Sequence, residues 1–183
     1  MAKPNRKRAA SFDTLLDYEA RSLGHVPGRP ESIEAAGHWR GVGFRLGQRR
    51  LVSSFEEVME ILPLPAVTPV PGAQPWMLGV ANVRGTLLPV VDLKQFLEGE
   101  RTVVHEGQRV LVVRQSGGNV AVLIDELFGQ RTFNDSHLIE SMSEEDERYA
   151  KFIPRFFDWG GTPYRVFSMS ALVRARDFTQ AAA

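Results

Sequence analysis

The residues best suited to molecular recognition lie between positions 79 and 93, where Arg84 stands between a predicted tight turn and a buried apolar run. Asn82 and Gly85 tolerate the positive φ of such a turn, and the apolar residues of 87–93 can supply core. Arginine carries a permanently charged fork of five donors, so on a rigid turn it suits a carboxylate or the backbone carbonyls of a partner. A surface ion pair with a neighbouring carboxylate is the alternative, and the residues alone do not separate the two.

The other polar residues do not assemble into a site for catalysis or metal binding. The four histidines are scattered, and His137 with Glu140 would supply two metal ligands without a third. The absence of cysteine excludes disulfides, thiol catalysis and thiolate metal sites. The chain also lacks a glycine-rich phosphate loop and a Gly-x-Ser-x-Gly nucleophile turn. We therefore expect no enzyme, no metal and no cofactor.

Composition points to a soluble cytoplasmic protein. The 183 residues include 22 Lys plus Arg and 22 Asp plus Glu, so the net charge is zero and gives no general attraction for a polyanion. No run approaches the roughly 18 apolar residues of a membrane helix. The basic residues near the N-terminus are not followed by the apolar stretch of a signal peptide.

The chain changes character near residue 40. Residues 1–39 are expected to form an extension that is partly helical, with Ser11 as a possible helix cap. From 40 to 176 the apolar period changes to two, with short β runs, turn residues and a proline-rich loop at 62–76 that must run over the surface or along a sheet edge. Residues 177–183 are expected to be a C-terminal tail.

Two segments of the β region, approximately 40–98 and 106–176, look like copies of one unit. Setting Val42 against Val110 aligns two hairpins without gaps, and a second match at a different offset aligns 85–97 with 161–173. A duplication predicts two small similar barrels that share an apolar seam, because units of this size are close to the limit of independent stability. Chance similarity between β-rich segments is the alternative.

Aromatic residues gather near the C-terminus beside Arg155. Aromatic side chains next to a basic residue on a small β-barrel can stack on single-stranded nucleic acid. The neutral net charge favours a core cluster instead. The residues concerned are Phe152, Phe156, Phe157 and Trp159.

These features together resemble the CheW family, the coupling proteins that join chemoreceptors to a histidine kinase in bacterial chemosensory arrays. The resemblance covers roughly residues 40–176. It rests on the stretches 42–47, 57–61, 79–85, 88–93 and 120–125. The stretches 11–16, 39–44 and 152–157 look most like the members of the family that serve type IV pili and twitching motility.

The resemblance implies a mainly β fold of two small five-stranded SH3-like barrels packed side by side, with short helices and the N-terminal helical extension. It implies a non-catalytic adaptor without a cofactor. The implied partners are the CheW-like regulatory domain of a CheA-type histidine kinase and the cytoplasmic tip of a methyl-accepting chemoreceptor. No nucleic acid and no direct membrane insertion are expected, and the protein would join membrane receptor arrays through these partners.

The family's Asn-x-Arg-Gly motif places the implied partner-binding residues at Asn82, Val83, Arg84 and Gly85, with Glu60 as the acidic residue that can pair with the arginine. Val58 matches a family position that faces the receptor. Alternation along 57–61 predicts that Val58 and Glu60 share one face of a strand.

The chain departs from the family at Val83, where leucine is frequent, and at Arg155, where many members have glycine. No partner role is assigned near Arg155 for that reason. A small β-barrel protein that binds nucleic acid or senses a small ligand remains the alternative function.

Overall fold

The computed structural model describes residues 14–15, 18, 38–140 and 147–181. The chain divides into residues 1–35 and 36–183. In the first unit Thr14, Leu15 and Tyr18 are helical, and the rest of the expected helical extension lies outside the described residues. Strand structure begins at His38, two residues before the expected start of the β region.

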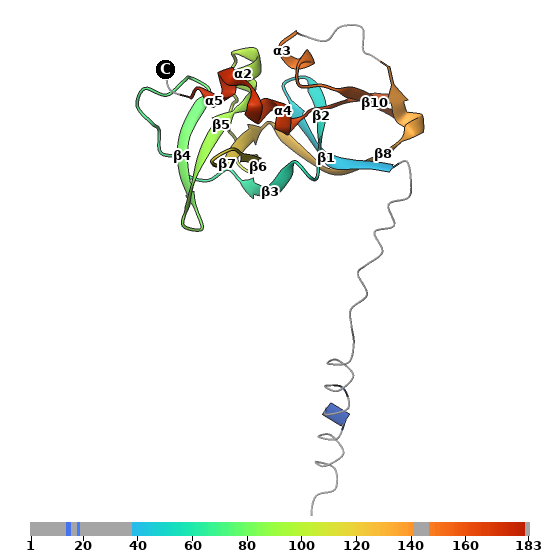
Figure 1. The fold of residues 1–183 in the computed structure, drawn as a ribbon, viewed down its shortest axis with the longest axis horizontal. Coiled ribbons are helices and arrows are strands. Elements are labelled where there is room, and N and C mark those ends of the chain that lie inside the picture. Colours follow the sequence, from blue (N-terminus) through green and yellow to red (C-terminus); the bar gives the residue numbers. More distant parts are fainter. Residues whose placement is uncertain (1–13, 16–17, 19–37, 141–146, 182–183) are drawn as a thin grey trace, which may run out of the picture. The chain divides into compact units, whose positions relative to one another are not determined.

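Residues 38–140 and 147–181 form a mainly β body with short helices (Figure 1). Its elements are β1 (His38–Leu46), β2 (Arg49–Ser54), β3 (Val58–Pro63), β4 (Met77–Val83), β5 (Thr86–Asp92), α2 (Leu93–Glu98), β6 (Arg109–Gln115), β7 (Gly118–Ile124), β8 (Glu126–Asn134), the 3-10 helix η1 (Asp135–His137), β9 (Leu138–Ile139), α3 (Glu147–Ala150), β10 (Arg155–Trp159), β11 (Thr162–Val166), α4 (Met169–Arg174) and α5 (Arg176–Thr179).

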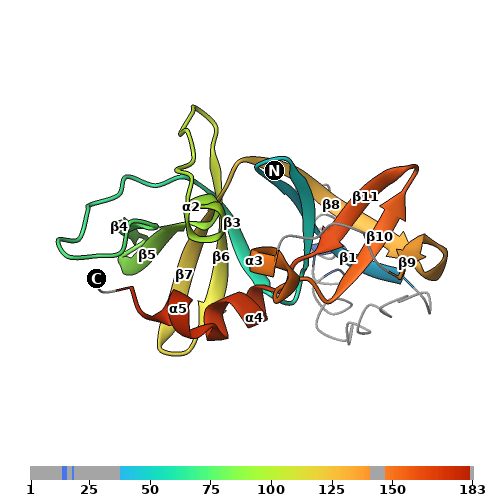
Figure 2. The same cartoon turned by 90° about the horizontal axis from the view of Figure 1, so that it is seen from above.

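The strands form two mixed sheets that lie side by side, with α3 and α4 between them (Figure 2). The six-stranded sheet has the order β8-β1-β2-β11-β10-β9, and the five-stranded sheet has the order β3-β6-β7-β5-β4. In neither sheet does the last strand pair with the first, so neither sheet closes into a barrel. The expectation of two five-stranded barrels is therefore wrong in closure and, for the six-stranded sheet, in strand number, whereas the mainly β class and the short helices are confirmed.

Each sheet combines the first hairpin of one expected copy, 40–98 or 106–176, with later strands of the other copy. The β1–β2 hairpin pairs with β8 and β11, and the β6–β7 hairpin pairs with β3 and β5. The segments 40–98 and 106–176 therefore do not each build one sheet, contrary to expectation. Two of these pairings, β2 with β11 and β5 with β7, are parallel. Parallel strands need a long crossover connection, which the turn residues in the sequence do not reveal.

The two expected copies nevertheless use the same local devices. Asp92 precedes α2 and accepts a hydrogen bond from the backbone N–H of Gln95 at 3.1 Å. Ser168 precedes α4 and accepts one from Ala171 at 3.1 Å, at the position that the second sequence match sets against Asp92. A side-chain acceptor at the N-cap satisfies a helix N–H that has no partner within the helix.

The largest apolar cluster lies between the sheets and confirms the expected shared seam. Phe44 and Leu51 enter it from the six-stranded sheet, and Leu111 and Val122 from the five-stranded sheet. Each sheet also has a smaller apolar cluster of its own, and Phe133 belongs to that of the six-stranded sheet. Burial of this kind contributes about 25 cal/mol per Å² of apolar surface, so the seam stabilises the packing of the two sheets against each other.

The aromatic residues near the C-terminus belong mostly to these clusters. Phe152 packs in the seam and Phe157 in the core of the six-stranded sheet, each at most 3% exposed. Phe156 is partly buried against the seam. Trp159 is different, because 47% of it is exposed at the end of β10.

The expected C-terminal tail packs on the body up to residue 181. Phe178 of α5 is 3% exposed and stacks on Trp76 with ring centroids 5.4 Å apart. The backbone N–H of Gln74 donates to the carbonyl of Ala181 at 2.9 Å. The proline-rich segment is also attached, since Thr68 forms a β-bridge with Val80 at the outer edge of β4. Within the described residues, no helix has the length and apolarity needed to cross a membrane.

Candidate functional site

The turn between β4 and β5 presents Arg84 on a tightly defined backbone. Val83 pairs with Thr86, so the hairpin loop contains two residues, Arg84 and Gly85, with φ of +51° and +84°. Two positive φ values in a two-residue loop define a type I′ turn, whose twist matches that of the strands. Arg84 is the one non-glycine residue with a positive φ in the part of the chain that the structure describes.

Asn82 supports the turn by its side chain and not by its own backbone angle. The residue lies in β4, and its Oδ1 accepts the N–H of Gly85 at 2.9 Å. Of the two residues expected to tolerate a positive φ, Gly85 has one and Asn82 does not, because the other loop position is occupied by Arg84. The side-chain hydrogen bond holds the loop in one shape before any partner arrives.

Arg84 and Glu60 form an ion pair that joins the turn after β4 to β3, and these are the two edge strands of the five-stranded sheet. The Nη2 atom of Arg84 lies 2.7 Å from Oε1 of Glu60 in β3. The arginine side chain is 75% exposed and the glutamate side chain 37%. A pair so open to water contributes only about 0 to 1 kcal/mol to stability, so folding alone gives little reason for it.

A shallow groove of about 170 Å³ lies beside this ion pair. Apolar side chains from β3, β4, β5 and β6 line it together with the two charged residues and two small polar ones. The arrangement can accept an apolar side chain of a partner while Arg84 meets a carboxylate or a carbonyl. The lining residues are Glu60, Leu62, Val83, Arg84, Thr86, Leu88, Val112 and Asn119.

Val58 and Glu60 lie on opposite faces of the sheet, so the expectation that they share a face is wrong. A register shift in β3 sets Val58 opposite Val113 and Glu60 opposite Val112. Adjacent residues of β6 point to opposite faces, and the bulge therefore turns Val58 into the seam, where it is 9% exposed. Sequence alternation could not reveal this bulge.

Sequence reasoning also missed two exposed apolar residues of β3. Met59 is 48% exposed and Ile61 is 36% exposed, directly beside the strand position of Glu60. A run of apolar residues interrupted only by Glu60 is typical of a buried strand. The sheet order shows instead that β3 is an edge strand. Neither residue lines the groove, and Ile61, which pairs with Leu111, lies on the opposite face of the sheet from Glu60.

The turn between β10 and β11 repeats the geometry of the Arg84 turn. Gly160 and Gly161 have φ of +61° and +78°, and Oδ1 of Asp158 accepts the N–H of Gly161 at 2.8 Å. Gly160 directly precedes the second sequence match in its copy, as Arg84 does in the first. The backbone of this turn therefore works with glycine, and the arginine in the first copy is not needed for the turn itself.

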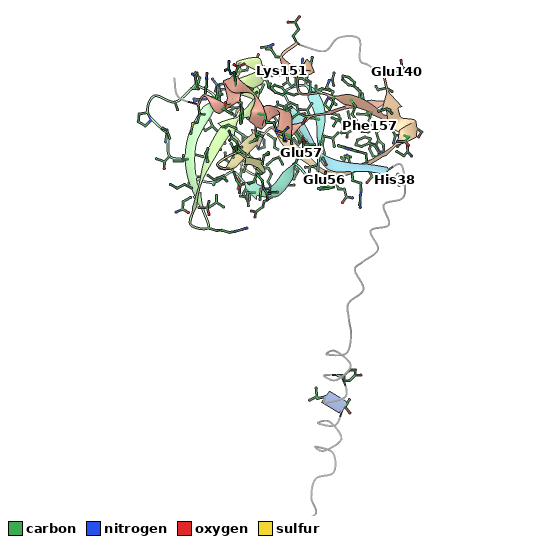
Figure 3. The ribbon with its side chains drawn as sticks, in the orientation of Figure 1. His38, Glu56, Glu57, Glu140, Lys151 and Phe157 are labelled. Atoms are coloured by element: carbon green, nitrogen blue, oxygen red, sulfur yellow. The ribbon has the colours of Figure 1, made fainter. Side chains whose placement is uncertain are left out.

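Glu57 fixes the start of β3 by capping a helix from the other half of the body. Its carboxylate accepts hydrogen bonds from Ser168 Oγ at 3.0 Å and from the backbone N–H groups of Met169 and Ser170 at 3.0 and 3.2 Å. A carboxylate at a helix N-terminus also faces the positive end of the helix dipole. Figure 3 shows Glu57 beside α4, where it ties the bulged strand to the seam.

A second, partly buried network connects α2, α3 and the β1–β2 hairpin. The hydroxyl of Tyr149 donates to Oε1 of Glu98 at 2.8 Å, and Nη1 of Arg49 donates to the same oxygen at 2.9 Å. The guanidinium lies 4.2 Å from the centre of the Tyr149 ring. Burial, and secondly the hydrogen bond to Glu98, raise the pKa of Tyr149 well above its usual range.

The described residues contain no group of three or more side chains that could hold a metal ion. His137 belongs to the 3-10 helix η1, and its Nδ1 accepts the N–H of Asn134 at 3.1 Å. Glu140 follows the short strand β9, so the two residues do not share a helix face as considered from the sequence.

The comparisons with known proteins identify the class to which this fold belongs. The CheW-like domain model matches residues 40–177, so the chain belongs to the CheW-like family of non-catalytic scaffold proteins. A solved structure, the scaffolding protein TtCheW from Thermoanaerobacter tengcongensis, shares the fold with a TM-score of 0.64. It is 16% identical, and the match covers 76% of this chain and 94% of that one.

Among its relatives is Protein PilI of Pseudomonas aeruginosa, which is 36% identical to this chain over 171 residues. The match covers 93% of this chain and 96% of PilI. The chemotaxis protein CheW of Bacillus subtilis is 29% identical over 101 residues, which cover 55% of this chain and 64% of that protein. Because only six residues follow residue 177, the similarity to PilI must continue into the segment before residue 40.

Proposed function

We propose that this chain is the adaptor that couples the cytoplasmic tip of a chemoreceptor to a CheA-type histidine kinase. Membership of the CheW-like family supports the adaptor role, and the similarity to PilI along nearly the whole chain supports a pathway that controls type IV pili and twitching motility. The adaptor works in the cytoplasm and reaches the membrane only through the receptor.

The observation that carries the proposal is the Arg84 turn. A charged residue that is 75% exposed occupies a backbone conformation that glycine adopts in the sister turn. A left-handed conformation costs a non-glycine residue about 1 to 2 kcal/mol, and the exposed ion pair returns little of this. The side chain is therefore retained for contact with another molecule, and its guanidinium fork fits a carboxylate or backbone carbonyls.

The six residues expected at the partner site take different roles in this proposal. Arg84, Glu60 and Val83 face the partner around the groove. Asn82 and Gly85 shape the turn that holds Arg84. Val58 does not contact the partner. Its packing in the seam fixes the bulge at which Met59 lies.

Calorimetry with two partner fragments tests the proposal. The parent protein should bind both the CheW-like domain of the kinase and a receptor-tip fragment from the same cell. Arg84→Ala should remain folded and lose about 2 kcal/mol, or roughly thirtyfold in affinity, toward at least one of them. Arg101→Ala removes an exposed arginine from a loop outside the groove and should bind like the parent.

Two results would contradict the adaptor. One is a folded parent protein that binds neither fragment. The other is an Arg84→Ala protein that binds both fragments as tightly as the parent, which would leave the family membership intact and remove Arg84 from the partner site.

A further inference from the structure

A second hollow, unrelated to the Arg84 groove, lies where three short helices meet the segment before β4. It has a volume of about 420 Å³, within the range of about 300 to 1,000 Å³ that is typical of small-molecule sites. Its walls come from α2, from α3 and the residue after it, and from α5 with the residue that follows. The lining residues are Gln74, Trp76, Phe96, Leu97, Arg148, Lys151, Asp177 and Gln180.

The apolar side of the hollow is held rigidly by aromatic packing. Trp76 meets the ring of Phe96 edge-on at 5.3 Å, and Phe178 stacks on Trp76 and meets Phe96 edge-on at 5.2 Å. Trp76 and Leu97 are at most 9% exposed and belong to the seam. A surface that is already ordered loses little entropy when a ligand binds to it.

Two cationic side chains and one carboxylate also line the hollow. Lys151 and Arg148 both line it, and Figure 3 shows Lys151 beside α3. The Nζ atom of Lys151 lies 3.8 Å from Oδ2 of Asp177, with the two side chains 51% and 78% exposed. Such a long and exposed pair holds the ammonium weakly, so an anion can replace Asp177 as its partner.

We propose that this hollow binds a small organic anion. The apolar part of the ligand lies against Trp76, Phe96 and Leu97, and its phosphate or carboxylate group lies beside Lys151 and Arg148. The amide groups of Gln74 and Gln180 offer donors at the rim. The hollow is built in part by α5, so an occupied site would hold the C-terminal helix in place.

Phenyl phosphate and inorganic phosphate are suitable probes, and the full-length protein provides its own reporter. The chain contains three tryptophans, and only Trp76 lines the hollow. In a ¹H–¹⁵N spectrum the indole signal of Trp76 should move on titration with phenyl phosphate, while those of Trp39 and Trp159 stay in place. Inorganic phosphate should bind more weakly, because it leaves the apolar side of the hollow unused.

Three substitutions should change the affinity for phenyl phosphate in three different ways. Lys151→Gln should weaken phenyl phosphate by about tenfold, as the loss of one charge-assisted hydrogen bond implies. Asp177→Asn should strengthen binding, because it removes the carboxylate that competes for Lys151. Arg174→Gln changes an exposed arginine of α4 outside the hollow and should leave binding unchanged.

Phenyl phosphate that leaves the Trp76 signal in place would overturn the proposal, and so would binding that Lys151→Gln and Asp177→Asn do not alter. Equal affinity for the two probes would reduce the site to a phosphate contact and also contradict it. The experiment uses no partner protein, so its outcome is independent of the adaptor proposal.

Discussion

At the scale of single residues, substitutions of Arg84 should affect stability and partner binding differently. The residue has φ of +51° where the sister turn has Gly160 with φ of +61°. Arg84→Gly relieves the left-handed strain but loses the ion pair to Glu60, so its free energy of unfolding should stay within about 1 kcal/mol of the parent. Arg84→Ala keeps the strain and loses the pair, so it should be the less stable of the two in urea titrations.

The comparison of these two variants is the decisive measurement. An alanine variant that is more stable than the glycine variant would show that the turn does not strain Arg84. Partner binding should be weakened in both, because neither carries the guanidinium group.

Tyr149 makes a prediction about alkaline pH. In the folded protein its pKa is raised by burial and by the hydrogen bond to Glu98, whereas in the unfolded chain it titrates near the ordinary value of about 10. Above that pH the unfolded chain loses the proton and the folded protein keeps it. This residue should therefore lower stability by up to about 1.4 kcal/mol for each pH unit above about 10.

Tyr149→Phe removes this titration and isolates its effect. Urea unfolding of the parent and the variant from about pH 8 to about pH 11 should show a constant difference below about pH 9 and a shrinking stability advantage of the parent above about pH 10. A difference that stays constant to the highest pH would mean that the tyrosine ionises as easily in the folded protein as in the unfolded chain.

At the scale of elements, α5 is part of the folded body although the family match ends inside it, at residue 177. Phe178 fills an aromatic cage formed with Trp76 and Phe96, and it is the one buried residue of this helix. Phe178→Ala should cost about 3 kcal/mol or more and lower the melting temperature. Thr179→Ala changes its exposed neighbour and should stay within about 0.5 kcal/mol of the parent. Equal melting of the Phe178→Ala variant and the parent would mean that α5 does not pack in solution.

At the scale of the whole molecule, the exchange of strands makes the two halves depend on each other. The β1–β2 hairpin finds its neighbours in β8 and β11, and the β6–β7 hairpin finds them in β3 and β5. Fragments 36–98 and 106–183 should therefore be unfolded when produced separately, because each leaves its hairpin and its seam exposed. Mixed in equal amounts they should regain β structure and one cooperative thermal transition by circular dichroism. A fragment that folds alone would contradict this interdependence.

The local elements were predictable because they depend on neighbours in the chain. Alternating apolar residues marked the hairpins of β1–β2 and β6–β7, and turn residues marked their loops. The ion pair of Glu60 and Arg84 followed from the resemblance to the CheW family and is present in the structure. The roles of Val58 and Asn82 were not predictable, because one depends on a bulge and the other on which residue of the loop takes the positive φ.

By itself the sequence determined the mainly β class, the CheW-like family, the arginine turn and the absence of cysteine chemistry. Periodicity, turn residues and composition act over a few positions, and a single chain displays them directly. Only the tertiary structure decided that the halves exchange strands, that Val58 turns into the seam, and that Phe178 completes it. These outcomes depend on which distant apolar surfaces bury one another most completely, and that competition takes place between segments whose local patterns are alike.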